Sequence, residues 1–169
     1  MQIHRCFAIW SSALLICFLF VSVIASQAQG KGKTQYACDE PNPASLCNAG
    51  NTCGSASTPC SVDVKKDGKG ATATPSIPGA KGNSLFCVQK GTTVTWTSSN
   101  KNTGFLIDFG PDSPFDYTGS LIGGASKPVS VIAEKEGCYK YSVGGCYPGA
   151  IYGMCGSGAA EAVVIAAPQ

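Results

Sequence analysis

The amino-acid sequence predicts an all-β fold, a sandwich of about seven or eight short strands that carries a disulfide-rich N-terminal extension. From Cys60 onward, apolar and polar residues alternate in short runs, which is typical of strands with one buried face. Turn-forming pairs such as Asp67-Gly68 and Lys90-Gly91 separate these runs. Because no stretch of this part keeps a helical period, we expect helix to contribute little to the fold.

The expected strands follow the alternation along the chain. Val94 and Trp96 share one face of a strand whose other face carries threonines, and Phe105, Ile107 and Phe109 alternate with their neighbours in the same way. The predicted strands occupy residues 61–64, 71–74, 85–88, 92–96, 105–109, 129–131, 139–143 and 162–166. The first two flank the Asp67-Gly68 turn, so we expect them to form a hairpin.

Residues 1–28 have the layout of a secretory signal peptide. A polar start with Arg5 precedes a long apolar run, and Ser26-Gln27-Ala28 then supplies the small residues that a signal peptidase requires. We expect cleavage after Ala28. The alternative is an uncleaved membrane anchor, because the apolar run approaches the roughly 20 residues that span a bilayer. In both cases the remainder lies outside the cytosol, so the expected location is secreted, periplasmic or cell-envelope.

Residues 29–169 contain eight of the ten cysteines, an even number that predicts up to four disulfides in an oxidising compartment. These candidates are Cys38, Cys47, Cys53, Cys60, Cys87, Cys138, Cys146 and Cys155. The first three lie in the polar N-terminal extension, residues 29–59, and the other five in the predicted sandwich, residues 60–169. If all eight pair within one chain, this odd split requires at least one disulfide between the extension and the sandwich.

Spacing and strand faces suggest particular pairs. Cys138 and Cys146 bracket a strand whose extended length of roughly 26 Å is far beyond the ~7 Å Cα separation of a disulfide, so they should not pair. Cys146 and Cys155 flank a glycine-rich loop that a disulfide could close. Cys87 and Cys138 both occupy the outer faces of their strands and could meet there. A metal-thiolate cluster is the alternative, but the chain lacks the Cys-x-x-Cys pairs that such clusters use.

Taken in order, several of these segments resemble the cupredoxin family, and more closely the small exported bacterial cupredoxin-like proteins that lack a copper site. The resemblance covers residues 60–166 and implies a Greek-key sandwich. It departs from the family at Glu161-Ala162, where such domains often have Asp-Pro before the last strand. The segments that carry it are Lys90-Gly91-x-x-Val94-x-Trp96, Phe105-x-Ile107-x-Phe109, Ser113-Pro114-Phe115, Gly137 to Val143, and Val163-Val164-Ile165.

The resemblance also implies where copper would bind, and the required ligands are missing. A type 1 copper site uses two imidazoles and a thiolate with a weak axial thioether. The only histidine, His4, lies in the predicted signal peptide. Copper-binding relatives would have their first histidine near Asn102-Thr103-Gly104 and their thiolate at Val143. Cys146 and Met154 follow in the next loop without a histidine between them. We therefore expect no copper and no other cofactor.

Charge and motifs exclude further functional classes. Residues 29–169 hold eleven lysines against ten acidic residues, a balance too even to predict nucleic-acid or anionic-membrane binding. Without histidine a Ser-His-Asp triad is impossible. Asp108, Asp112 and Asp116 gather around a proline-rich loop and could in principle form a carboxylate pair of the glycosidase type, but aspartate is also the ordinary residue of such turns. We expect turn roles for them and no enzymatic activity.

Two tyrosines remain as candidate surface binding residues. Tyr147 and Tyr152 lie in the glycine-rich loop between the last two cysteines, where exposure is expected, whereas Tyr139 and Tyr141 alternate as core residues. The leading hypothesis is a non-catalytic, copper-free domain with a structural or binding role toward a protein or glycan of the envelope. The alternative is a protein that uses its thiols for redox chemistry or for metal handling.

Overall fold

A computed structural model describes residues 37–68, 70–147, 155–157 and 161–167. The chain divides into two units, residues 1–35 and 36–169, and all described residues belong to the second unit. The predicted signal peptide and Tyr152 therefore lie outside the described residues. Within the described part of the chain, no helix is long and apolar enough to cross a membrane.

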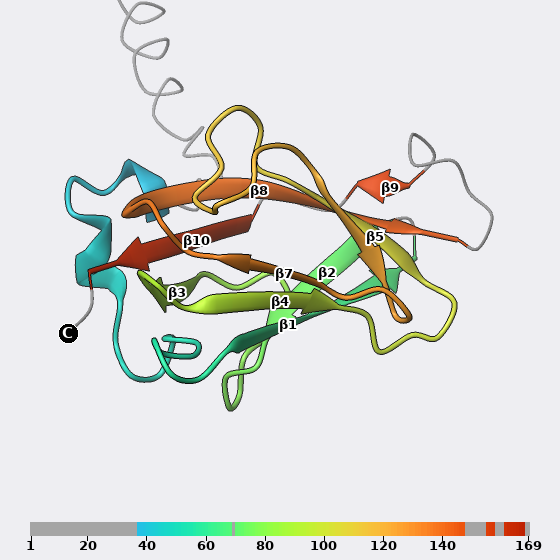
Figure 1. The fold of residues 1–169 in the computed structure, drawn as a ribbon, viewed down its shortest axis with the longest axis horizontal. Coiled ribbons are helices and arrows are strands. Elements are labelled where there is room, and N and C mark those ends of the chain that lie inside the picture. The colour runs from blue at the N-terminus through green and yellow to red at the C-terminus, as the bar shows by residue number, and fades with distance from the viewer. Residues whose placement is uncertain (1–36, 69, 148–154, 158–160, 168–169) are drawn as a thin grey trace, which may run out of the picture. The chain divides into compact units, whose positions relative to one another are not determined.

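The second unit is an all-β structure in two sheets (Figure 1). Two short 3-10 helices, η2 (Ala37–Asp39) and η3 (Pro43–Leu46), precede the strands. The strands among the described residues are β1 (Cys60–Asp67), β2 (Gly70–Pro75), β3 (Phe86–Gln89), β4 (Thr93–Thr97), β5 (Gly104–Asp108), β6 (Leu121–Gly124), β7 (Val129–Ile132), β8 (Gly137–Cys146), β9 (Gly156–Ser157) and β10 (Glu161–Ala166).

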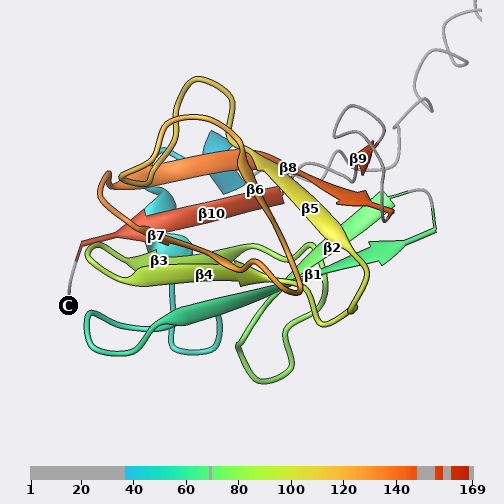
Figure 2. The same cartoon turned by 45° about the vertical axis from the view of Figure 1, so that its right-hand side comes forward.

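One sheet has the strand order β2-β1-β4-β7, and the other has the order β3-β10-β8-β5-β6 with β9 paired to β8. Two pairings join strands that are distant in sequence and run parallel, namely β1 with β4 and β3 with β10. The chain changes sheet after β2, β3, β4, β6 and β7. Figure 2 shows the two layers in a turned view. Repeated crossing of this kind buries one face of each sheet against the other.

The core lies between the sheets and is centred on Trp96 of β4. The fully buried Trp96 ring meets Phe86, Phe109 and Tyr141 edge-on, with ring centroids 6.5, 6.4 and 5.5 Å away respectively. Edge-on aromatic pairs contribute about 0.5–1.5 kcal/mol each beyond the area they bury. The threonines that alternate with Val94 and Trp96 are only partly buried, as the alternation in this run predicts.

The predicted hairpin is present. β1 and β2 pair antiparallel with Asp67 opposite Gly70, and Gly68 in the turn has a φ of 55°, a conformation that glycine adopts without strain. The described residues form more strands than the seven or eight expected, because the glycine-containing strand β6 and the two-residue strand β9 were not predicted. In addition, β8 continues through two glycines to Cys146 instead of ending at Val143.

Three disulfides tie the N-terminal extension to the strands. Cys38 pairs with Cys138, Cys47 with Cys87, and Cys53 with Cys60 at the start of β1. The extension also adds to a sheet edge, because Thr52 forms a parallel bridge with Cys87 of β3. The sequence required at least one disulfide between the extension and the sandwich, and the structure has these three. Cross-links of this kind hold a segment that has too few apolar residues to form its own core.

The expected Cys87–Cys138 pair was wrong. Cys87 and Cys138 lie in the same sheet, but β10 separates their strands, and Val164 is opposite both of them. Two strand spacings amount to about 9–10 Å, beyond the reach of a disulfide. The extension places Cys47 and Cys38 within reach of these two cysteines. Figure 1 shows this blue segment beside β8 and β10.

Candidate functional site

The end of β8 is the region where the family resemblance implies a metal site. Cys146 is the last residue of β8 and lies opposite Gly104, the first residue of β5. The Cys146 side chain forms a disulfide with Cys155, the pairing expected from the sequence. The segment Asn102-Thr103-Gly104 therefore ends beside this disulfide, because its last residue, Gly104, is the one opposite Cys146. Val143, the position that the resemblance implies for the thiolate, lies three residues earlier in β8 and is opposite Ile107 of β5 instead of Gly104.

The residues at this end do not fit a type 1 copper ion. Asn102, Thr103 and Gly104 offer no imidazole, and the Cys146 sulfur is bonded to another sulfur instead of being a thiolate. Met154, the remaining soft ligand in sequence, lies outside the described residues. The described residues also contain no group of three histidine, cysteine or acidic side chains placed to hold a metal ion.

Tyr147 follows this disulfide and is the most exposed aromatic side chain among the described residues, with 66% of its surface accessible. The Lys66 ammonium group lies 4.2 Å from the centre of the Tyr147 ring, a cation–π contact between β1 and the residue after β8. Gly145 permits this approach, because a Cβ there would lie 3.1 Å from Cβ of Lys66 and 3.2 Å from Cβ of Ala71. The second candidate, Tyr152, lies outside the described residues.

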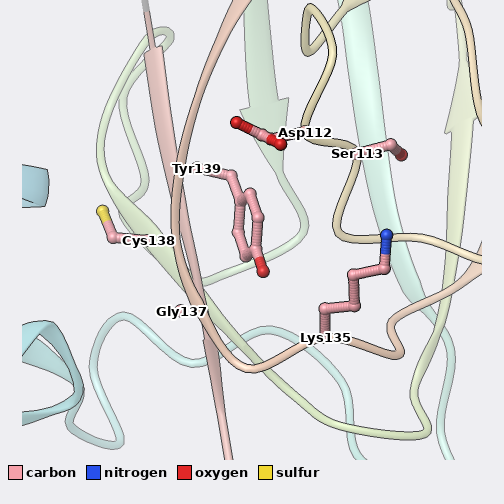
Figure 3. Close-up of a pocket in the computed structure, with 6 residues that line it drawn as sticks. All are labelled: Asp112, Ser113, Lys135, Gly137, Cys138 and Tyr139. Atoms are coloured by element: carbon pink, nitrogen blue, oxygen red, sulfur yellow. The ribbon is translucent and has the colours of Figure 1, made fainter.

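A hollow of about 290 Å³ lies at the opposite end of β8. Figure 3 shows the Tyr139 ring beside the Asp112 carboxylate and the Lys135 side chain, while the Cys138 sulfur points to the other side of the strand. Its lining comes from the loop after β5, the turn before β8 and the first residues of β8: Asp112, Ser113, Lys135, Gly137, Cys138 and Tyr139. The sequence did not predict this hollow, since Asp112 was interpreted as a turn residue and Tyr139 as core.

Backbone hydrogen bonds fix the frame of the hollow. The amide groups of Glu134 and Lys135 both donate to the Pro114 carbonyl oxygen, at 2.9 and 3.1 Å. Phe115 forms an isolated bridge with Ala133, and the buried Ser113 hydroxyl accepts a bond from the Phe115 amide at 3.3 Å. On the remaining side, the Cys38–Cys138 disulfide anchors the first residues of β8 to the extension. The loop after β5 and the turn before β8 therefore hold one another in place.

Tyr139 is partly buried and packs against the core while its ring lines the hollow. Its hydroxyl donates a hydrogen bond to the Glu136 carbonyl oxygen at 3.2 Å. Burial raises the pKa of Tyr139 above its usual value of 10.0, and the nearby Asp112 carboxylate raises it further. Gly137 has a φ of 143° and leaves room for the ring, because a Cβ there would lie 3.3 Å from the nearest Tyr139 atoms.

The three aspartates around the proline-rich loop have separate roles. Asp108 accepts a hydrogen bond from the Gly110 amide at 2.9 Å, which is the local turn bond expected of aspartate. Asp116 accepts from the Ile132 amide at 2.9 Å and thereby covers part of the β7 edge. Of the three, only Asp112 lines the hollow. They do not converge as a carboxylate pair on one pocket.

No model of a known protein family matches this sequence, and no curated protein is significantly similar to it.

Proposed function

We propose that this protein is an exported, copper-free cupredoxin-like domain with a structural or binding role in the cell envelope or outside the cell. The observation that carries the proposal is the Cys146–Cys155 disulfide at the junction of β5 and β8. This disulfide begins three residues beyond Val143, the position that the resemblance implies for the thiolate, and it leaves neither of its two sulfurs free to act as a thiolate.

The cupredoxin-like part of the proposal is supported by the arrangement of the chain. The chain crosses repeatedly between the two sheets, so that each sheet contains strands from distant parts of the sequence. Gly104 at the start of β5 lies opposite Cys146 at the end of β8. The resemblance implies the first histidine near Gly104 and the thiolate at Val143, which lies on the same strand as Cys146 and three residues before it. A shared framework does not supply a shared function, so the missing ligands outweigh the resemblance in the choice of activity.

Export is supported by the four disulfides, which indicate an oxidising environment. The predicted signal peptide in residues 1–28 agrees with that environment. Every cysteine in the described part of the chain is disulfide-bonded, which argues against the alternative of a thiol-based redox or metal-handling protein. The binding role is supported by Tyr147, whose exposed ring is held by Lys66 beside the disulfide.

Equilibrium dialysis against copper tests the proposal. The disulfide-intact protein, purified from the exported fraction, is dialysed against Cu(II) and, separately, against Cu(I). The proposal predicts no stoichiometric copper and no thiolate-to-copper absorption band in the visible. One tightly bound copper per chain in either dialysis would overturn it. The control is a Cys146→Ala/Cys155→Ala variant, which removes both sulfurs without adding a ligand. Comparison with this variant shows whether any copper bound by the intact protein depends on these two sulfurs.

A further inference from the structure

The hollow at the start of β8 combines an aromatic wall with two charged groups of opposite sign. Tyr139 supplies the ring, Asp112 a carboxylate that accepts hydrogen bonds, and Lys135 an ammonium group that donates them (Figure 3). We propose that this hollow binds a single neutral sugar ring of a glycan. The site lies at the opposite end of β8 from Tyr147, so the proposal stands apart from the copper question and gives the proposed binding role a ligand class.

The two charged side chains are available to a ligand. Within the described residues, neither Asp112 nor Lys135 forms an ion pair or a side-chain hydrogen bond with the protein. By contrast, Asp108 and Asp116 on the same loop are engaged by backbone amides. Side chains that are placed in a hollow without a protein partner can exchange water for ligand hydroxyl groups at little cost in existing contacts.

Hydrogen bonds and a disulfide hold the frame around these side chains before any ligand arrives. The Pro114 carbonyl oxygen binds the Glu134 and Lys135 amides, and the Cys38–Cys138 disulfide holds the strand that carries Tyr139. The Tyr139 ring is itself fixed by its hydrogen bond to the Glu136 carbonyl oxygen. Binding therefore does not have to order this loop or the ring, which favours measurable affinity from a small contact.

The size and charge of the hollow select the ligand class. At about 290 Å³, it lies at the lower limit of the ~300–1,000 Å³ range of small-molecule sites, so it suits one ring better than an extended peptide. Asp112 and Lys135 balance one another, and the neighbouring Glu136 is paired with Lys90 at 3.6 Å. The residues that line the hollow therefore carry no net charge. A sugar ring combines apolar C–H groups for the tyrosine with hydroxyls that both donate and accept.

Backbone amide NMR shifts test the proposal with glucose, galactose, mannose and N-acetylglucosamine as probes. At least one of these sugars should shift the amides of Lys135, Gly137 and Tyr139 with a dissociation constant in the millimolar range. Asp112→Asn and Lys135→Met should each weaken that affinity about tenfold, since each removes a charge-assisted hydrogen bond. Two control substitutions should leave the affinity unchanged: Asp67→Asn at the exposed end of β1, and Tyr117→Ala at an exposed tyrosine.

Three outcomes would overturn the proposal: no sugar shifts these amides, the shifts survive both Asp112→Asn and Lys135→Met, or a free amino acid such as glycine binds here in preference to the sugars. The last outcome would assign the hollow to a zwitterion held between the carboxylate and the ammonium group. Asp112 and Lys135 are exposed, so these variants are expected to fold. Copper dialysis has no bearing on any of these results, which keeps failure of this proposal separate from failure of the proposed function.

Discussion

Cys87 and Cys138 lie opposite the same residue, Val164 of β10, one on each side of that strand. Each is bonded to a different cysteine of the N-terminal extension, so the extension spans three neighbouring strands, β3, β10 and β8. The extension has few apolar residues, and its attachment therefore depends on these covalent links.

Removing either long-range disulfide of the extension should cost more stability than removing the disulfide at the end of β8. The Cys38–Cys138 bridge closes a sequence separation of 100 residues and Cys47–Cys87 one of 40. In the chain-entropy model these stabilise the fold by about 4.7 and about 4 kcal/mol. Cys146–Cys155, with a separation of 9, contributes a little under ~3 kcal/mol. Urea unfolding of the three double-alanine variants measures this order, and a reversed order would contradict the account.

Gly123→Ala should destabilise the fold by about 1–3 kcal/mol through overpacking. A Cβ at Gly123 of β6 would lie 2.5 Å from the Phe105 ring and 2.7 Å from the backbone oxygen of Lys127. The matched control is Gly104→Ala on the partner strand β5, where the nearest atoms would lie at an ordinary 3.6 Å. Thermal unfolding of both variants provides the comparison. Equal losses of stability would show that β6 does not pack on Phe105 as described.

Tyr139 should make the fold less stable at alkaline pH. Its pKa in the folded state is raised by burial and by Asp112, so above pH 10 the unfolded chain releases this proton more readily than the folded one. The stability contributed by Tyr139 is therefore complete below pH 10 and is lost as the pH rises through the folded pKa. Tyr139→Phe should remove this part of the alkaline loss, measured by urea unfolding at several pH values.

Asp112→Asn provides the control for that experiment. It leaves the phenol in place and removes the carboxylate, so the pKa of Tyr139 should fall while remaining above its usual value, because burial is the larger cause. Absorbance titration of the phenolate, with Tyr139→Phe as the reference, follows this group. An unchanged pKa in Asp112→Asn would show that Asp112 does not act on the Tyr139 ring.

The Lys66–Tyr147 contact should contribute about 0.5–1 kcal/mol to stability, as expected for an exposed cation–π pair. The ammonium group lies 4.2 Å from the ring centre. A double-mutant cycle with Lys66→Met and Tyr147→Leu measures the coupling between the two residues. A coupling energy of zero would mean that nothing holds the Tyr147 ring at this surface, which would weaken its candidacy as a binding residue.

The alternation of side chains was enough to predict most of the fold. Val94 and Trp96 are buried between threonines, and the Asp67-Gly68 turn joins two antiparallel strands, as expected. Strand β6 was not predicted, because Leu121–Gly124 is short and half glycine and therefore has almost no strand signal of its own. It forms because β5 offers a partner and because Gly123 leaves room for the Phe105 ring.

Predicting the candidate sites required more knowledge of the tertiary arrangement than predicting the strands did. The cysteines of the disulfides could be listed from sequence, and Cys146–Cys155 could be paired because a local loop joins them. The partners of Cys87 and Cys138 could not be assigned, since that requires knowing that β10 lies between β3 and β8. The hollow was missed for the same reason. Asp112 and Tyr139 come together only when the loop after β5 reaches the start of β8, and sequence shows no local pattern for that contact.

Native mass spectrometry of the protein purified from the exported fraction, with and without reductant, tests whether four disulfides hold the domain and whether it carries a metal. Alkylation under native conditions should modify no cysteine of residues 29–169, and all eight should react after reduction, with no metal mass in either native sample. This result would support an exported, disulfide-held domain without a metal site. Free thiols in the native protein, or a stoichiometric bound metal, would contradict the account and favour thiol-based redox chemistry or metal handling.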